Sequence, residues 1–166
     1  HVIVALVGGS SGGKTYSAIL LGRGLVGPKG KMALIDTESG RGRIYANIAD
    51  YDYAELSAPF TPERYIEAIK DAETAGYDAL VIDSLSHEWN AIGGVLEIAD
   101  AGKSASGKAL TGLVKWAQPK MRHRRFIQAL LNTRLHLILC LRAKEKLKQV
   151  RIDGKEEIVS DGWVSV

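Results

Sequence analysis

The sequence is poor in cysteine and in long apolar runs, and both shortages narrow the classes of protein that it can represent. Its single cysteine, Cys140, permits no disulfide within the chain, which is typical of a reducing cytosol. No apolar run reaches membrane-spanning length and no signal peptide is visible after His1, so we expect a cytoplasmic protein without membrane contact. The length of 166 residues, with 46% hydrophobic and 25% charged residues, predicts a single globular domain over 1–166.

Acidic and basic residues are distributed unevenly along the chain, although the formal net charge is only +3. Residues 1–101 hold 8 Lys and Arg against 14 Asp and Glu, whereas residues 102–166 hold 14 against 5. Such asymmetry is found in proteins that bind a polyanion, and also where two solvated faces offset each other. Charge alone therefore leaves the partner open.

Glycine and serine are concentrated between two segments that both look buried, in the stretch "VIVALVGGSSGGKTYSAILL". Its centre fits the phosphate-binding pattern G-x-x-x-x-G-K-[ST], with a strand expected over 2–7 and a helix over 15–25. Glycines let backbone N–H groups converge on phosphate oxygens, and the start of a helix favours anions. The alternative is a plain Gly/Ser-rich turn. The residues expected to bind the nucleotide are Gly8, Gly9, Ser10, Ser11, Gly12, Gly13, Lys14, Thr15 and Tyr16, with Lys14 near the β- and γ-phosphates and the Thr15 hydroxyl on Mg²⁺.

The rest of the chain alternates between strand-like and helix-like segments, which predicts an α/β fold with a parallel sheet covered by helices on both faces. Glycine and polar residues over 101–109 predict a loop, and Asp153-Gly154 predicts the turn of a C-terminal hairpin. Strands are expected over 31–36, 53–58, 78–83 and 135–141, helices over 61–75, 86–100 and 111–132 with an interruption near Pro119, and the hairpin over 145–160.

Acidic residues stand at or just beyond the ends of the predicted strands. Asp83 ends the apolar strand of "ALVIDS", where a carboxylate can hold Mg²⁺ through water or, alternatively, cap the next helix. The usual AAA+ pattern places a catalytic Glu directly after this Asp, but Ser84 stands there. A water-activating carboxylate must therefore come from Glu38 or from Glu88, unless both are ordinary surface residues.

Several stretches resemble the RecA-like recombinase core in order and spacing, namely "LIDTESGRGRIYA", "YAELSAPFTPERYIEAIKDAETAGYDALVIDS" and "LHLILCLRAKEK". The segments "DSLSHEW" (83–89) and "LRAK" (141–144) resemble more narrowly a group of phage-encoded, RecA-like ATP-binding proteins of the AAA type. The resemblance implies a P-loop NTPase fold in which the strand at 135–141 lies between those at 2–7 and 79–83. A complete core of this kind usually continues beyond the hairpin, so the chain is either a fragment or a trimmed version.

The resemblance also implies roles for individual residues. It places the catalytic carboxylate at Glu38 and an adenine-stacking ring at Tyr45. At the end of the sensor strand the recombinases carry Gln, whereas this chain has Arg142, which can contact phosphate oxygens or simply end a strand. His87, Glu88 and Trp89 form a distinctive cluster that either links nucleotide state to the following loop or packs the start of a helix.

In the recombinases the segments that correspond to 89–112 and 143–157 face DNA. Lys144, Lys146 and Lys148 alternate and would share one face of a strand, and a further basic cluster is expected on the helix at Arg122, Arg124 and Arg125. The alternatives are a lysine that reaches a neighbouring subunit's nucleotide in a homo-oligomer, and a solvated basic face.

Together these features predict a Mg²⁺-dependent ATPase, of phage or prophage origin, that binds ATP and ADP and acts with single-stranded DNA in recombination or annealing. The first alternative is a nucleotide-dependent switch module with little turnover. The second is a P-loop kinase for a small molecule, which the scarcity of Arg in the loop at 101–109 disfavours.

Overall fold

The computed structural model describes the backbone of residues 1–152 and 155–165. Its elements follow the predicted alternation of strands and helices, although the single helix expected over 86–100 is divided into two. The strands are β1 (Ile3–Gly8), β2 (Met32–Asp36), β3 (Asp52–Glu55), β4 (Ala79–Asp83), β5 (His136–Ile152) and β6 (Lys155–Ser165). The helices are α1 (Lys14–Val26), η1 (Arg41–Tyr45), α2 (Pro62–Thr74), α3 (Ser86–Asn90), α4 (Val95–Ala101), η2 (Gly112–Trp116) and α5 (Ala117–Asn132), where η marks 3₁₀ helices.

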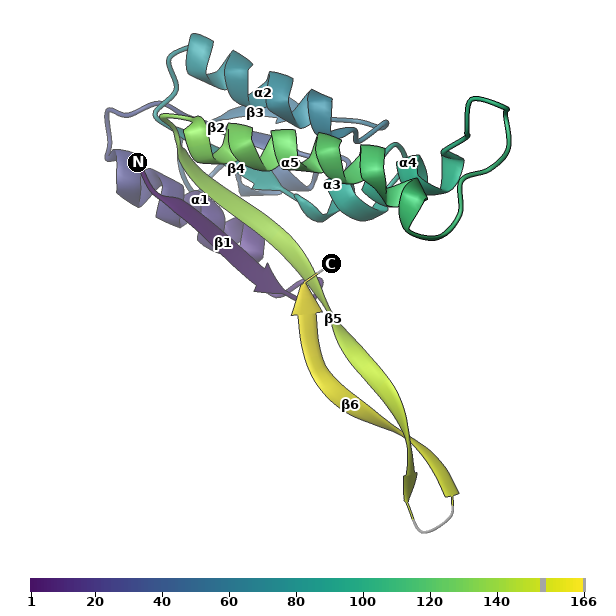
Figure 1. Ribbon diagram of the computed structural model, residues 1–166. Coiled ribbons are helices and arrows are strands. Elements are labelled where there is room, and N and C mark those ends of the chain that lie inside the picture. Colours follow the sequence, from purple (N-terminus) through teal and green to yellow (C-terminus); the bar gives the residue numbers. More distant parts are fainter. Residues whose placement is uncertain (153–154, 166) are drawn as a thin grey trace.

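The sheet has the strand order β1-β5-β4-β2-β3, and these five strands are parallel (Figure 1). The predicted position of the 135–141 strand between the first strand and the strand ending at Asp83 is therefore confirmed. Parallel strands align their carboxyl ends, so Gly8 pairs with Arg142 and Asp36 pairs with Asp83 in the register. Side chains from four strands thus meet at one edge of the sheet.

Helices cover both faces of the sheet, as expected for parallel strands. Helix α1 packs on one face, where Ala18 and Ile19 meet the buried side chains of Leu34, Val81 and Ile138. Helix α1 approaches the sheet closely at Gly22, where only glycine fits, because a Cβ built on this residue would lie 2.5 Å from the Met32 sulfur.

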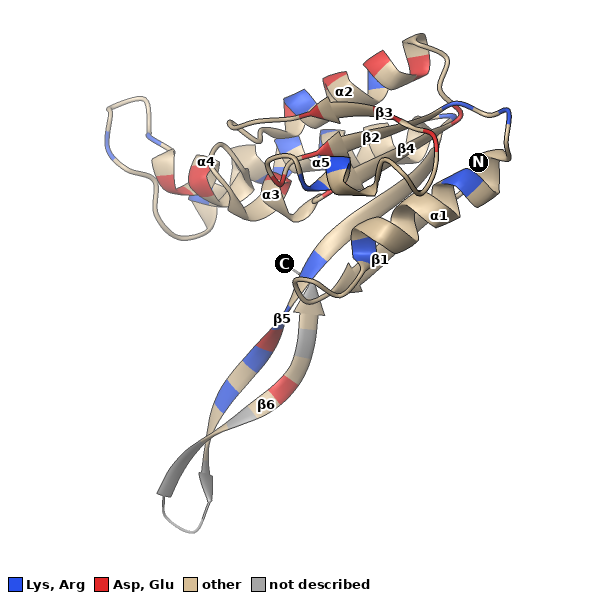
Figure 2. Cartoon of the chain, turned by 180° about the vertical axis from the view of Figure 1, so that it is seen from behind, with Lys and Arg blue, Asp and Glu red and all other residues tan. Residues whose placement is uncertain are grey.

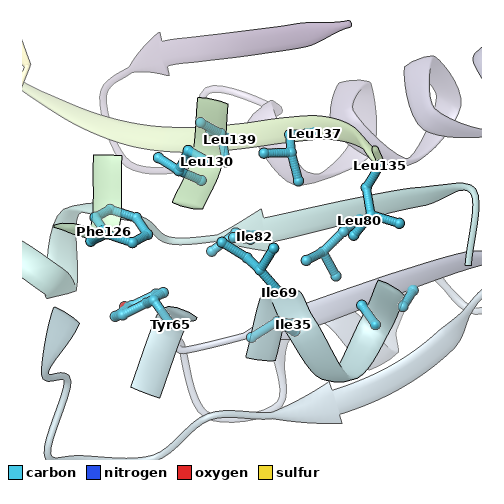
Figure 3. Packing of buried hydrophobic residues seen from close by; sticks show 12 residues of the cluster. Ile35, Tyr65, Ile69, Leu80, Ile82, Phe126, Leu130, Leu135, Leu137 and Leu139 are labelled. Carbon is cyan, nitrogen blue, oxygen red and sulfur yellow. The ribbon is translucent and has the colours of Figure 1, made fainter. Parts of the chain in front are cut away.

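Helices α2 and α5 cover the other face, where Tyr65 and Ile69 meet Phe126 and Leu130 over the central strands (Figure 3). The rings of Tyr65 and Phe126 lie 5.6 Å apart. Each helix therefore buries one apolar stripe against a continuous apolar strand surface, which is the main source of stability in such a fold.

Strand β5 continues beyond the sheet and pairs with β6 in antiparallel fashion, so the two strands form an arm that extends from the body (Figure 1). The predicted C-terminal hairpin is confirmed, but its first strand is continuous with the sheet strand rather than separate. The expected turn at Asp153-Gly154 lies outside the described residues. The register shifts between Glu145 and Leu147, which marks a bulge.

The expected interruption near Pro119 is confirmed, and it lies just before this residue. The chain changes from the 3₁₀ helix η2 to α5 between Trp116 and Ala117, and Pro119 lies in the first turn of α5. A proline is tolerated there, because the first N–H groups of a helix have no partner within it.

Neighbouring leucines on α5 allow a matched test of this packing, because Leu130 is 5% exposed and Leu131 is 57% exposed. We expect Leu130→Ala to lower the free energy of unfolding by about 2–5 kcal/mol, the usual cost of such a truncation in a core. Leu131→Ala should change it by less than about 1 kcal/mol. Urea denaturation measures both, and equal losses would contradict the packing of α5 on the sheet.

Candidate nucleotide-binding site

A cavity of about 250 Å³ opens at the carboxyl edge of the sheet. It brings together residues from the phosphate loop, from the segment after β2, and from the ends of β4 and β5. Most of the residues expected to bind nucleotide or metal line it. The lining residues are Ser10, Ser11, Gly12, Gly13, Lys14, Thr15, Glu38, Arg41, Ile44, Tyr45, Asp83 and Arg142.

The phosphate loop joins β1 to α1 and begins the helix at Lys14. Gly13 has a φ of 76°, a left-handed conformation that glycine adopts without strain. The Lys14 ammonium donates to the carbonyls of Gly8 and Gly9 at 3.0 and 2.8 Å. Gly8 and Gly9 therefore contribute carbonyls that hold the lysine, whereas residues 10–15 face the cavity.

Thr15 and Asp83 lie in direct contact, as a shared role in holding Mg²⁺ requires. The Thr15 hydroxyl donates to Asp83 Oδ2 at 2.5 Å. Burial raises the pKa of Asp83 and the nearby charges of Glu38 and Asp36 raise it further, while the Thr15 hydrogen bond and Lys14 oppose them. A desolvated carboxylate among other acids gains most from a cation, so the pair suits a metal ion.

The oxygen atoms of Thr15 and Asp83 are hard ligands of the type that Mg²⁺ prefers. Among the described residues there is no group of three or more His, Cys, Asp and Glu side chains placed to hold a metal. A bound Mg²⁺ would thus take its other ligands from phosphates and water, which is its usual mode in nucleotide sites.

Glu38 lies between two arginines. Arg142 donates to its Oε1 from Nε at 3.0 Å and from a terminal nitrogen at 2.8 Å, and Arg41 donates to Oε2 at 2.8 Å. Burial alone would raise the pKa of Glu38, but the hydrogen bonds and charges of these arginines outweigh it and the pKa lies below its ordinary value. The carboxylate is therefore ionised at neutral pH, as a general base must be.

Asp36 holds the segment that carries Glu38, a role that the sequence did not reveal. Its carboxylate accepts from the N–H groups of Glu38 and Gly42 at 2.6 and 2.7 Å and from the Tyr53 hydroxyl at 3.0 Å. Asp36 is 1% exposed. Its position at the end of a wholly buried strand was the available signal, since a buried carboxylate needs such partners. Arg41 was likewise not anticipated.

Ser84, which stands in place of the AAA+ catalytic Glu, is fully buried and connects strand ends. Its N–H donates to the Thr37 hydroxyl at 2.7 Å, and this hydroxyl donates to the Ser84 carbonyl at 3.0 Å. The Thr37 N–H donates to the Asp83 carbonyl at 2.7 Å. These bonds fix the segment after β2 against the end of β4.

Tyr45 ends the 3₁₀ helix η1 and lines the cavity. Its ring lies 6.3 Å from that of Tyr16, at 67°. Tyr16 is 45% exposed and borders the site without lining it. The two rings offer an aromatic surface beside the phosphate loop.

Glu88, the competing candidate for the catalytic base, does not line this cavity. It lies on α3, is 2% exposed, and contacts His123 of α5 through both carboxylate oxygens at 3.0 Å. His87 packs on the Phe60 ring at 5.0 Å, and burial, together with the charge of Arg142, lowers its pKa. Trp89 lies almost parallel to Trp116. The His87–Glu88–Trp89 cluster therefore packs α3 against its neighbours.

Several of the basic residues expected to face DNA have acidic partners. Lys146 and Lys148 both reach Asp161 of β6, at 2.9 and 2.8 Å, so they share a face, and this one carboxylate offsets part of their charge. Arg122 forms a two-pronged pair with Glu63. In the part of the chain that the structure describes, no ion pair involves Lys144, Arg124 or Arg125, and Figure 2 shows the alternation of basic and acidic residues along the arm. Acidic residues are thus interspersed among the basic residues expected to face DNA.

Comparison with known proteins places these features in a family. A family model described as an AAA domain matches residues 1–161, which include the phosphate loop, both strand-end acids and Arg142. No curated protein matches the chain. Within the described residues, no helix combines the length and apolar character needed to span a bilayer.

Asp83→Asn tests the electrostatics of the site. Burial holds the pKa of Asp83 in the folded protein above its pKa in the unfolded chain. The free energy of unfolding of the wild type therefore falls as the pH rises through the interval between these two pKa values, whereas that of the variant does not. We expect the variant without nucleotide to unfold at higher urea concentration at pH 7, with a difference that vanishes in acid. Its affinity for ATP–Mg²⁺ should fall at least about tenfold.

Asp71→Asn is the matched control, because Asp71 is exposed on α2 away from the cavity. It should alter neither stability nor ATP affinity. Identical urea curves for Asp83→Asn and wild type from pH 4 to pH 8 would show that Asp83 is not a destabilised carboxylate.

Proposed function

Because the chain belongs to the AAA domain family, we propose that it is a Mg²⁺-dependent ATPase acting on single-stranded DNA, in phage recombination or annealing within the bacterial cytoplasm. One observation carries the ATPase assignment. Lys14, Thr15, Asp83, Glu38 and Arg142, which come from four separate parts of the chain, line a single cavity. This is the set of groups that phosphoryl transfer to water requires.

Nucleotide binding replaces hydrogen bonds that residues of the site form with one another. The Lys14 ammonium leaves the carbonyls of Gly8 and Gly9 for the β- and γ-phosphates. Thr15 and Asp83 would hold Mg²⁺, and the ion would supply positive charge beside the phosphates. Tyr45 stacks on the adenine, as the resemblance to the RecA-like core implies.

Hydrolysis transfers the γ-phosphoryl group of ATP to the oxygen of a water molecule, and ADP leaves. Glu38 accepts a proton from that water as the new P–O bond forms and the bond to the β-phosphate oxygen breaks. In the structure, Arg142 forms a salt bridge with Glu38. In the reacting complex it turns to the γ-phosphate, which frees Glu38 and stabilises the charge of the transition state.

Glu38→Gln and Glu88→Gln separate the two candidate bases. Glu38→Gln should bind ATP–Mg²⁺ about as well as wild type and hydrolyse it at least about tenfold more slowly, because a general base acts mainly in the transition state. Glu88→Gln should cost less in basal turnover. Steady-state phosphate release measures both; normal turnover by Glu38→Gln together with slow turnover by Glu88→Gln would assign the role to Glu88.

Lys14→Ala tests the phosphate loop. The side chain contacts the carbonyls of its own loop rather than the core, so the variant should keep the fold and the urea midpoint. Its affinity for ATP should fall strongly, because the charge nearest the β- and γ-phosphates is lost. The exposed Lys29 supplies a control, since Lys29→Ala should bind a fluorescent ATP analogue normally. Unchanged affinity of Lys14→Ala for ATP would contradict the assignment of the phosphate loop.

The DNA-binding role rests on the resemblance and on the positions of segments 89–112 and 143–157. The first follows β4 through α3 and α4, and the described residues of the second, 143–152 and 155–157, belong to the arm beyond the sheet. Lys103 and Lys108 lie in the loop between α4 and η2, and Lys144 lies on the arm. None of the three forms an ion pair within the described residues, so they supply cations that can bind phosphates. The same arm can bring Lys144 or Lys146 to a neighbouring subunit's nucleotide in a homo-oligomer, which is the second use that we propose for it.

A switch module with little turnover is the competing function, and the Glu38–Arg142 salt bridge is the observation that favours it. A base held by two arginines hydrolyses ATP slowly unless Arg142 moves. The small-molecule kinase is disfavoured, because β5 rather than β4 lies beside β1. Direct β1–β4 pairing would instead favour the kinase and GTPase division.

A further inference from the structure

The two carboxylate oxygens of Glu38 have different partners. Oε1 accepts from Arg142 at 3.0 and 2.8 Å, whereas Oε2 accepts from Arg41 at 2.8 Å. Arg142 reaches Glu38 from β5, 104 residues further along the chain, whereas Arg41 follows Glu38 by three residues. The proposed hydrolysis uses Arg142 and gives Arg41 no role, although Arg41 also lines the nucleotide cavity.

The short segment that carries both Glu38 and Arg41 is fixed at its two ends. The Asp36 carboxylate accepts from the N–H of Glu38 at 2.6 Å and from the N–H of Gly42 at 2.7 Å. Between these bonds the chain turns at Gly40, whose φ of 91° is left-handed. The contact between Arg41 and Glu38 thus belongs to one locally fixed turn. A movement of the Arg142 side chain toward a phosphate would leave this contact in place.

A bound triphosphate makes the surroundings of Glu38 less favourable to a carboxylate. Burial raises the pKa of Glu38, and hydrogen bonds and charge from Arg142 and Arg41 lower it. When Arg142 turns to the γ-phosphate, one of these two cations is lost and further negative charge has arrived. The other titratable or charged groups around Glu38 are Lys14 on α1, Asp36 at the end of β2, Asp83 at the end of β4, His87 on α3 and Cys140 on β5.

None of these other groups replaces Arg142. Asp36 and Asp83 are acids, and Lys14 is expected to bind the phosphates. Burial lowers the pKa of His87 and raises that of the Cys140 thiol, so both are uncharged at pH 7. Among the described residues around Glu38, Arg41 is therefore the cation that can remain on the carboxylate during the reaction.

We propose that Arg41 is the positioning residue of the general base, holding Glu38 by Oε2 while Arg142 turns away and leaves Oε1 free to accept the proton of water. The water oxygen forms the new bond to the γ-phosphorus, and the bond to the β-phosphate oxygen breaks with its electrons passing to ADP. The inference rests on the proposed ATPase activity and assigns separate tasks to the two arginines. Arg142 regulates access to Oε1, and Arg41 keeps the carboxylate ionised and in place.

The pH dependence of kcat at saturating ATP–Mg²⁺ tests this role in Arg41→Ala. Loss of the Arg41 charge raises the pKa of Glu38, so the acid limb of the profile should move to higher pH. The Arg41 side chain is 56% exposed and solvent weakens its effect. We expect turnover at least about threefold slower than wild type at pH 5.5 and within about twofold of it at pH 8, with unchanged KM. Arg41→Lys keeps the charge and should lie closer to wild type at pH 5.5.

Arg43→Ala is the matched control, because it removes the same charge from the same 3₁₀ helix. The Arg43 guanidinium lies over the Tyr53 ring, 4.7 Å from its centre, and does not line the cavity. This variant should keep the wild-type profile. An equal loss of turnover in Arg41→Ala at every pH would show a structural role and overturn the proposal. A raised KM with an unshifted profile would overturn it too, because Arg41 would then bind the nucleotide.

A second measurement needs no hydrolysis. In Arg142→Ala, which imitates the departure of Arg142, the Glu38 carboxyl is titrated by ¹³C NMR, and its signal is assigned by its loss in Glu38→Gln. The pKa of Glu38 should be lower in Arg142→Ala than in the double variant Arg142→Ala/Arg41→Ala. Equal values would overturn the role of Arg41 even if the wild type hydrolysed ATP. Different values in a chain without turnover would instead overturn the ATPase, and with it the catalytic use of this contact.

Discussion

The position of β5 between β1 and β4 is the constraint on which the candidate site depends. Parallel pairing sets Gly8 beside Arg142 and Asp83 beside Cys140, while β2 sets Asp36 beside Asp83. All the chemically active groups follow from these registers. Because side chains alternate along a strand, a shift of β5 by one residue would turn Arg142 away from Glu38 and disrupt the edge.

The same edge of the sheet concentrates charged side chains, and this arrangement favours the binding of a ligand. Asp36, Glu38 and Asp83 lie close together, and their repulsion is relieved by Arg142, Arg41 and Lys14. Lys14, Thr15 and Arg142, which are expected to meet ATP–Mg²⁺, already have protein partners, namely carbonyls or a carboxylate. Binding therefore exchanges one set of contacts for another, and the cost of a buried carboxylate such as Asp83 is offset when a cation arrives.

The sequence predicted the parts of the site that depend on local pattern, and missed those that depend on how distant side chains meet. The phosphate loop follows from spacing and flanking segments, and the β5 position followed from the resemblance rather than from periodicity. The Glu38–Arg142 contact joins residues from two strands that are not neighbours, and no local signal reports it. Asp36 looked like a strand end, although its carboxylate organises the loop that carries Glu38.

The basic residues show the same limit. The alternation of Lys144, Lys146 and Lys148 indicated one cationic face, but Asp161 comes from the returning strand and its pairing depends on the register of the arm. Glu88 was close to Asp83 in sequence, yet α3 directs it to His123 on α5, away from the nucleotide cavity. Periodicity predicts the face of a strand or helix on which a side chain lies, whereas tertiary packing determines which residues that side chain contacts.

The rate of ATP hydrolysis with and without single-stranded DNA tests the central claim most directly, because it asks whether the assembled edge performs chemistry and whether DNA governs it. The account predicts Mg²⁺-dependent phosphate release that rises when single-stranded DNA is added. Tight ATP binding with no phosphate release under either condition would contradict it and identify the chain as a nucleotide-dependent switch.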